Sequence, residues 1–103
     1  MQLIGAAIIP NDRGFSIEGS ATFHNVVALR QLGEQALRTH FLKNKLAVIH
    51  FSNFKDHNAS SFSLLLCWMR LAKQNDARLQ FNDLPDSMRR MEKMFGLTGV
   101  CNG

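Results

Sequence analysis

The chain has 103 residues and a formal net charge of +4 at pH 7 with neutral histidines. This length suffices for one domain with one hydrophobic core but not for two, so we expect a single domain over residues 1–103. Hydrophobic residues make up 46% of the sequence and charged residues 19%, the usual balance of a water-soluble globular protein. No apolar run reaches the roughly 18 residues that a membrane-spanning helix needs.

The first elements that we expect are two strands. Residues 3–9 are apolar, and the turn-forming run from Pro10 to Gly14 follows them. Residues 15–19 alternate between apolar and polar side chains, as a half-buried strand does, so the two segments predict a hairpin. Because no basic leader precedes the short apolar run, we interpret it as a strand rather than a signal peptide and expect a cytoplasmic protein.

An amphipathic helix and a central strand are predicted next. Thr22 is a candidate N-cap, and apolar residues recur at three- and four-residue spacings from Val26 until the helix ends near His40. Residues 46–51 form a nearly continuous apolar run, which is typical of a central strand that is covered on at least one face.

The most informative segment is a second helix that ends near Gln74. Ser60 and Ser61 stand at its polar start, where they can satisfy backbone amides and where the helix dipole favours negative charge. Its apolar residues lie on two faces, one with Phe62, Leu65, Leu66, Met69 and Ala72 and the other with Leu64, Trp68 and Leu71. Such a helix must be covered on nearly all sides. Either neighbouring helices cover it, or a partner protein does, with Trp68 as an interface anchor.

A short strand and a third helix complete the predicted order. Residues 79–81 alternate, Pro85 stands near the start of a helix with an apolar stripe, and Gly96 is a natural terminator before a frayed tail after Leu97. The resulting order, β-β-α-β-α-β-α, predicts an α/β fold with a partly parallel sheet and covering helices.

The charged and reactive residues point to no enzyme. The cluster Arg89–Lys93 is diluted by carboxylates, so we interpret it as a solvated helix face, with a patch for an acidic protein or lipid headgroups as the alternative. We expect Cys67 to be a buried thiol, and its distance in sequence from Cys101 implies no disulfide framework.

No catalytic or metal-binding pattern is present in the sequence. The four histidines do not stand at metal-ligand spacing with the cysteines, and the adjacent pair Asp56 and His57 lacks a nucleophile with a base and an orienting group. No glycine pattern predicts a phosphate-binding loop. We therefore expect no enzyme activity, no cofactor and no metal.

Most of the chain, and residues 58–97 most sharply, resembles the STAS domain, the fold of anti-sigma-factor antagonists and of the accessory subunit of lipid-transport ABC systems. Members of this family carry Asp-Ser/Thr-x-Gly before an apolar Leu-x-x-Leu-Leu helix, and Asn58-Ala59-Ser60-Ser61 followed by Phe62-Ser63-Leu64-Leu65-Leu66 occupies that place here. Residues 15–23 look like the second strand of the family and the turn after it. Residues 78–85 and 94–97 look most like the lipid-transport branch. The resemblance implies a STAS fold with a mixed sheet of four or five strands.

The departures from the family pattern bear on function. Ala59 stands at the phosphorylatable position and has no hydroxyl, and Asn58 removes the accompanying carboxylate. The resemblance therefore implies a non-enzymatic accessory subunit that docks on the ATPase of a phospholipid-transport ABC transporter of the Mla type. The contact would be made by Asn58, Ala59, Ser60, Ser61 and Phe62, and the protein would be peripheral to the inner membrane through that complex.

Two other functions stay open. In the first, Ser60 takes the phosphorylatable position through a one-residue slip, and the protein is an anti-sigma-factor antagonist, or a degenerate relative, that binds a serine kinase of the anti-sigma type. The weaker alternative is a small-molecule or lipid-binding module, for which a ligand would raise the melting temperature.

Overall fold

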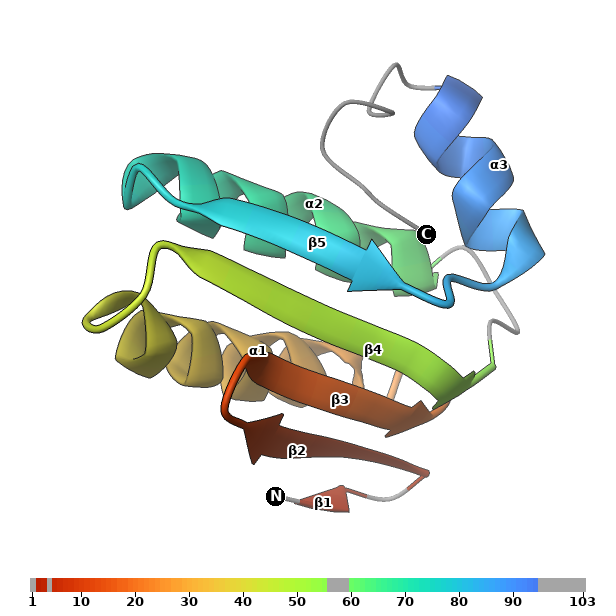
Figure 1. Cartoon of the computed structure of the whole chain (residues 1–103). Coiled ribbons are helices and arrows are strands. Elements are labelled where there is room, and N and C mark those ends of the chain that lie inside the picture. Colours follow the sequence, from red (N-terminus) through yellow and green to blue (C-terminus); the bar gives the residue numbers. More distant parts are fainter. Residues whose placement is uncertain (1, 4, 56–59, 95–103) are drawn as a thin grey trace.

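A computed structural model describes residues 2–3, 5–55 and 60–94 of the chain. Its five-stranded sheet has the order β1-β2-β3-β4-β5, and helices α1 and α2 cover one face of it (Figure 1). The elements are β1 (Gln2–Leu3), β2 (Ala6–Asn11), β3 (Gly14–Gly19), α1 (Val26–Phe41), β4 (Leu46–Phe54), α2 (Ser60–Gln74), β5 (Arg78–Asn82) and α3 (Asp86–Met94). The predicted α/β fold and the order of its elements are confirmed, with the two-residue β1 as an addition.

The predicted hairpin is present, but its turn is tighter than expected. Strands β2 and β3 are antiparallel, and Asn11 lies opposite Gly14, so only two residues connect them. The Asn11 Oδ1 atom accepts hydrogen bonds from the backbone N–H groups of Arg13 (2.9 Å) and Gly14 (3.0 Å). The strand continues through Pro10, and the described residues of β1 lie opposite Ala6 and Ala7, away from Pro10. The missing N–H of the proline therefore removes no hydrogen bond to β1.

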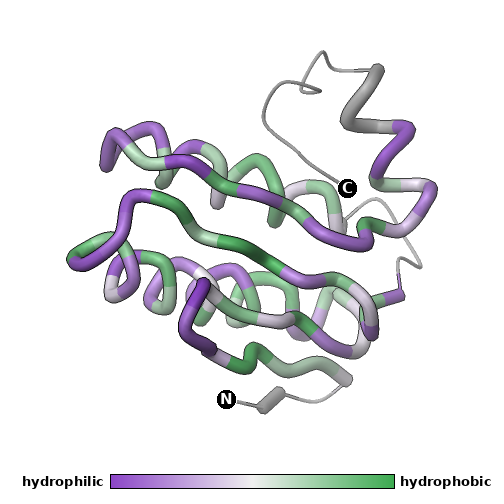
Figure 2. The backbone as a smooth tube through the Cα atoms, viewed as in Figure 1, coloured by the Kyte–Doolittle hydropathy of each residue, from purple (hydrophilic) through white to green (hydrophobic). Residues whose placement is uncertain are grey.

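Two parallel crossovers build the rest of the sheet. Strand β4 pairs with β3 on one side and β5 on the other, both in parallel, through α1 and α2. Connections between neighbouring parallel strands are right-handed, which places both helices on the same face. In Figure 2 the middle of β4 is strongly hydrophobic, as the sequence predicted for a central strand.

The core lies between the sheet and these two helices. Its largest fully buried side chains include Phe15, Phe51 and Phe81 from the strands and Leu29, Leu37, Leu65 and Trp68 from the helices. The Trp68 ring meets Phe15 edge to face, with ring centroids 5.2 Å apart. Aromatic pairs in this geometry add stabilisation beyond the area that they bury.

Trp68 also holds α1 and α2 together. It is fully buried, and its Nε1–H donates a hydrogen bond of 3.2 Å to the Arg30 carbonyl oxygen. Gly33 of α1 faces the indole so closely that an added Cβ would lie 2.4 Å from the ring. A neighbouring helix therefore covers Trp68, which was one of the two alternatives predicted from the sequence. The indole is not an exposed interface anchor.

Two expectations about helix positions are wrong in detail. Cys67 is half-buried rather than buried, because it lies beside the gap between α1 and α2. Thr22 is not the N-cap of α1, since the helix begins at Val26 with Asn25 in the N-cap position. Thr22 instead donates its backbone N–H to Asn25 Oδ1 at 2.8 Å.

Helix α3 packs at the end of the molecule, with Leu84 before it and Met88 inside it both buried. Phe95, Gly96, the tail after Leu97 and Cys101 lie outside the described residues. Within the described ranges, no helix has both the length and the apolar character required to cross a membrane.

Candidate functional site

Three connections meet at one edge of the sheet. Because β3, β4 and β5 run parallel, their carboxyl ends lead into α1, α2 and α3 on the right-hand side of Figure 1. We call this edge the carboxyl edge; it comprises the described residues 20–27, 55, 60–63 and 83–85. Binding sites of open α/β sheets commonly lie at this edge.

Three residues of the predicted partner-binding segment, Ser60, Ser61 and Phe62, lie at the carboxyl edge. Asn58 and Ala59 lie outside the described residues, and Ser60 is the first residue of α2. Ser61 and Phe62 are buried, with exposed fractions of 0% and 4%. In this conformation the side chains of Ser61 and Phe62 therefore face the core. A partner would contact the exposed residues around them rather than these two side chains directly. Partner binding by the five residues stays a prediction.

The Ser61 hydroxyl is a polar group in an apolar place. Its Oγ atom is buried and has no hydrogen-bond partner among the described residues. A buried hydroxyl without a partner destabilises the folded state, because it has given up its hydrogen bonds to water.

The β3–α1 connection is held firmly at the same edge. Gly19 has a φ of +87°, and an added Cβ would lie 2.1 Å from the Gly5 carbonyl oxygen. The Gly19 carbonyl oxygen accepts the backbone N–H of Lys55 at 2.7 Å, which ties this connection to the end of β4. Farther along, Asn25 Nδ2–H donates to the Ser20 carbonyl oxygen at 3.1 Å. The backbone here is thus fixed before α1 begins.

Two apolar side chains, one in this connection and one in the first turn of α1, are exposed to solvent. Phe23 is 87% exposed and Val27 is 57% exposed. The sequence analysis missed Phe23 as a surface residue, because it took residues 15–23 as a strand and the turn after it. The available signal was its position just before the periodic apolar pattern that starts at Val26. An exposed aromatic side chain on a rigid backbone is the type of residue that anchors protein interfaces.

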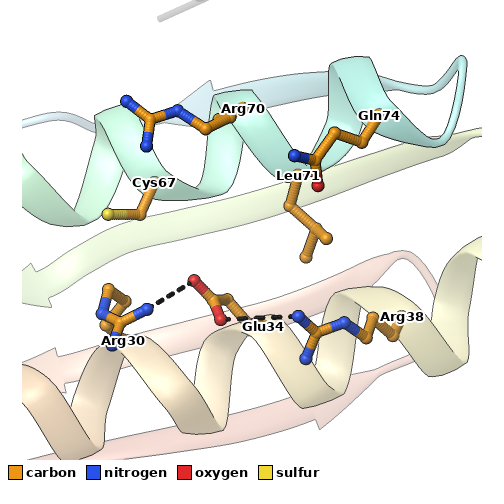
Figure 3. A pocket seen from close by; sticks show the side chains of 7 residues that line it. All are labelled: Arg30, Glu34, Arg38, Cys67, Arg70, Leu71 and Gln74. Atoms are coloured by element: carbon orange, nitrogen blue, oxygen red, sulfur yellow. Dashed lines mark hydrogen bonds and ion pairs between the residues drawn. The ribbon is translucent and has the colours of Figure 1, made fainter.

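A separate pocket lies between the exposed sides of α1 and α2. Its volume is about 180 Å³, and Figure 3 shows its lining residues Arg30, Glu34, Arg38, Cys67, Arg70, Leu71 and Gln74. The two carboxylate oxygens of Glu34 contact Arg30 at 3.0 Å and Arg38 at 3.7 Å. The carboxylate is therefore already engaged, and no histidine lines the pocket beside the Cys67 thiol, so the lining contains no nucleophile–base pair.

Across the described ranges, no group of three or more His, Cys, Asp or Glu side chains is arranged to hold a metal ion.

Neither a protein-family model nor a curated protein matches this chain. Solved structures do match it. One is the anti-sigma factor antagonist SpoIIAA in its unphosphorylated form, with a TM-score of 0.65 and 18% identity over 94% of this chain and 85% of that chain. The fold is that of the anti-sigma-factor antagonists, the STAS fold.

A second match is the Bacillus cell fate determinant SpoIIAA in the phosphorylated form. Its TM-score is 0.68 at 17% identity, over 94% of this chain and 88% of that chain. The predicted STAS fold is thus confirmed, whereas the comparisons do not support the closer resemblance to the lipid-transport branch.

Proposed function

We propose that this chain is a non-enzymatic binding domain of the anti-sigma-factor-antagonist kind, which binds an anti-sigma factor or a serine kinase of that type. The observation that carries the proposal is the match of the fold to SpoIIAA over 94% of the chain. Because one fold can host unrelated functions, the carboxyl edge supplies the second support.

The chemistry of the carboxyl edge suits protein binding. Phe23 and Val27 offer apolar contact area, and the hydrogen bonds of the β3–α1 connection fix their backbone before a partner arrives. A rigid surface loses little conformational entropy on binding, so more of the contact energy appears as affinity. Ser60 lies at this edge as the first residue of α2, and Asn58 and Ala59, which precede it in the sequence, remain part of the proposed contact.

Phosphorylation at Ser60 belongs to the same proposal. The helix dipole would favour a phosphate at the first residue of α2. The phosphate would add about two negative charges to the carboxyl edge. The added charge would weaken the binding of a partner with an acidic surface and strengthen the binding of one with a basic surface. Incubation with an anti-sigma-type kinase and ATP should then label the wild-type chain but not Ser60→Ala.

The proposed partner is tested by affinity capture from the native host, followed by mass spectrometry. We expect recovery of an anti-sigma factor or its kinase with wild-type protein, and at least tenfold less with Phe23→Ser. The matched control is Leu42→Ser, which removes an equally exposed side chain (85%) in the connection between α1 and β4. Equal recovery with all three proteins would contradict the proposed surface.

Docking on an ABC-transporter ATPase is the second candidate. One sequence feature favours it: Ala59 cannot be phosphorylated, and a constitutive subunit needs no phosphate. Recovery of an ATPase together with its permease, in place of an anti-sigma factor, would decide for this candidate.

A further inference from the structure

The opposite edge of the sheet brings three other connections together. They are the β2–β3 turn, the α1–β4 connection and the α2–β5 connection, on the left-hand side of Figure 1. Two backbone hydrogen bonds of 2.8 Å join them, from Val48 N–H to the Arg13 carbonyl oxygen and from Arg78 N–H to the Lys45 carbonyl oxygen. We call this surface the amino edge.

Most of the net positive charge of the chain is concentrated at the amino edge. Its cationic residues are Arg13, Lys43, Lys45, Lys73 and Arg78, all exposed, and its carboxylates are Asp12 and Asp76. Five cations against two carboxylates leave a surplus of three, out of a net charge of +4 for the whole chain. Arg38, in the last turn of α1, is not counted, because its guanidinium pairs with Glu34. The remainder of the molecule is nearly neutral.

An exposed leucine lies among these cationic residues. Leu42 is 85% exposed and Leu46 is 44% exposed, and Lys43 and Lys45 lie between them in the sequence. The two apolar side chains and the two ammonium groups therefore lie within residues 42–46, the α1–β4 connection and the first residue of β4.

The backbone that carries Leu42 is well ordered. The His40 carbonyl oxygen accepts the N–H groups of Lys43 and Asn44, both at 3.0 Å. The His40 Nε2 atom lies 2.7 Å from the Leu46 carbonyl oxygen, and Lys45 Nζ donates to the Asn75 carbonyl oxygen at 3.1 Å. The exposure of Leu42 is thus a fixed property of the fold rather than the result of a loose loop.

We propose that the amino edge docks on an anionic lipid bilayer. Leu42 would enter the boundary between headgroups and acyl chains, while the surrounding lysines and arginines contact the lipid phosphates. Apolar residues flanked by cations bind such surfaces through both apolar burial and attraction to anionic lipid. Lysine stems also bury alongside apolar groups while their ammonium groups stay in water.

Two features favour a bilayer over other anionic partners. No Phe or Trp is exposed among the described residues of this edge, so it offers no aromatic platform on which nucleic-acid bases would stack. The Leu42 side chain is 85% exposed, so it would gain apolar burial on entering the boundary between headgroups and acyl chains. The surface also lies opposite the carboxyl edge, so lipid and protein binding are independent and can fail separately.

Co-sedimentation of the full chain with lipid vesicles tests the proposal. The vesicles contain phosphatidylcholine alone, or with about one-third phosphatidylglycerol, at low and at physiological salt. We expect binding only to the anionic vesicles, and weaker binding as salt rises. Lys43→Gln with Lys73→Gln should weaken it roughly thirtyfold, and Leu42→Ser roughly tenfold.

Matched controls separate local from general effects. Arg89→Gln with Arg90→Gln removes the same two charges from exposed positions of α3, and Phe23→Ser removes an equally exposed apolar side chain from the carboxyl edge. Both should bind anionic vesicles as the wild type does.

Three outcomes would overturn the proposal. The first is no binding to anionic vesicles at low salt, and the second is an equal loss in the control variants. The third is a loss with the lysine variant but none with Leu42→Ser, together with equal affinity for duplex DNA or a poly-glutamate peptide. That pattern would assign the edge to an anionic macromolecule instead.

Discussion

At the scale of single residues, one missing side chain sets the spacing of two helices. Gly33 lets the Trp68 indole lie directly against the α1 backbone, where the Arg30 carbonyl oxygen accepts its N–H. The pairing depends on long-range geometry, because the two residues are far apart in sequence. For this reason the sequence alone left open whether Trp68 was buried.

The first prediction concerns this contact. In an exposed helix position, Gly→Ala would stabilise the protein by about 1 kcal/mol through helix propensity. Gly33→Ala should instead lower the free energy of unfolding by about 1–3 kcal/mol, because the new Cβ would overlap the indole. Urea unfolding measures the difference. The control, Gln35→Ala on the exposed side of α1, should not destabilise the protein. If Gly33→Ala left the free energy of unfolding unchanged, the close packing of Gly33 against Trp68 would be refuted.

The second prediction concerns the Ser61 hydroxyl. Ser61→Ala removes a buried polar atom that has no partner in the described part of the chain, so stability should rise by about 1 kcal/mol. Thermal unfolding is a sufficient measurement. Ser52→Ala, at an exposed position of β4, should show no such rise, since water already satisfies that hydroxyl. A lower stability for Ser61→Ala would mean that the hydroxyl has a partner in the folded protein.

At the scale of elements, local sequence patterns predicted which segments form helices and strands and in what order, but not where every element ends. The alternation of residues 15–19 and the helical spacing after Val26 are local signals, and both elements are present. Strand β4 was expected to end at Phe51 but reaches Phe54. Its last residues are held by β3, where Asn53 lies opposite Glu18 and Phe54 opposite Gly19. Such cross-strand pairs join distant residues and leave no local signal.

The candidate site was less predictable than the fold for a related reason. The polar start of α2 was found from its residues, but the exposure of Phe23 depends on how the β3–α1 connection leaves the sheet. An exposed Phe and a buried Phe look the same in sequence. The half-exposure of Cys67 likewise follows from the position of α1, not from the α2 pattern.

The third prediction concerns the charges between α1 and α2. Glu34 is flanked by Arg30 and Arg38 at four-residue spacing, and its side chain is only 14% exposed. Glu34→Gln should lower the free energy of unfolding by about 0.5–1 kcal/mol at low salt and by less at high salt, because salt screens the lost attraction. Urea midpoints at the two salt concentrations measure this, with Gln31→Ala as the control without salt dependence. Equal effects at both would argue against an ionic origin.

At the scale of the whole molecule, sheet and helices share one continuous core. Phe15 and Ile49 from the sheet, Leu29 from α1 and Trp68 from α2 all belong to the same buried cluster. One shared cluster that joins the sheet to both helices is consistent with one cooperative unit.

The fourth prediction follows from that shared core. Residues 1–103 should unfold in a single transition, with the same midpoint by tryptophan fluorescence and by far-ultraviolet circular dichroism. The chain has one tryptophan, and in the folded state it is fully buried between the two helices, so its emission reports the core. Two separate midpoints would contradict the single-domain interpretation.

The two-residue strand β1 and the proline beside it have a consequence for self-association. Among the described residues, β1 lies opposite Ala6 and Ala7, and the far end of β2, near Pro10, is where a second chain would have to extend the sheet. Pro10 has no amide hydrogen to offer such a chain, so the ladder of an incoming strand would be interrupted within a few residues. We therefore expect this edge to resist fibril growth and the protein to stay dispersed at high concentration.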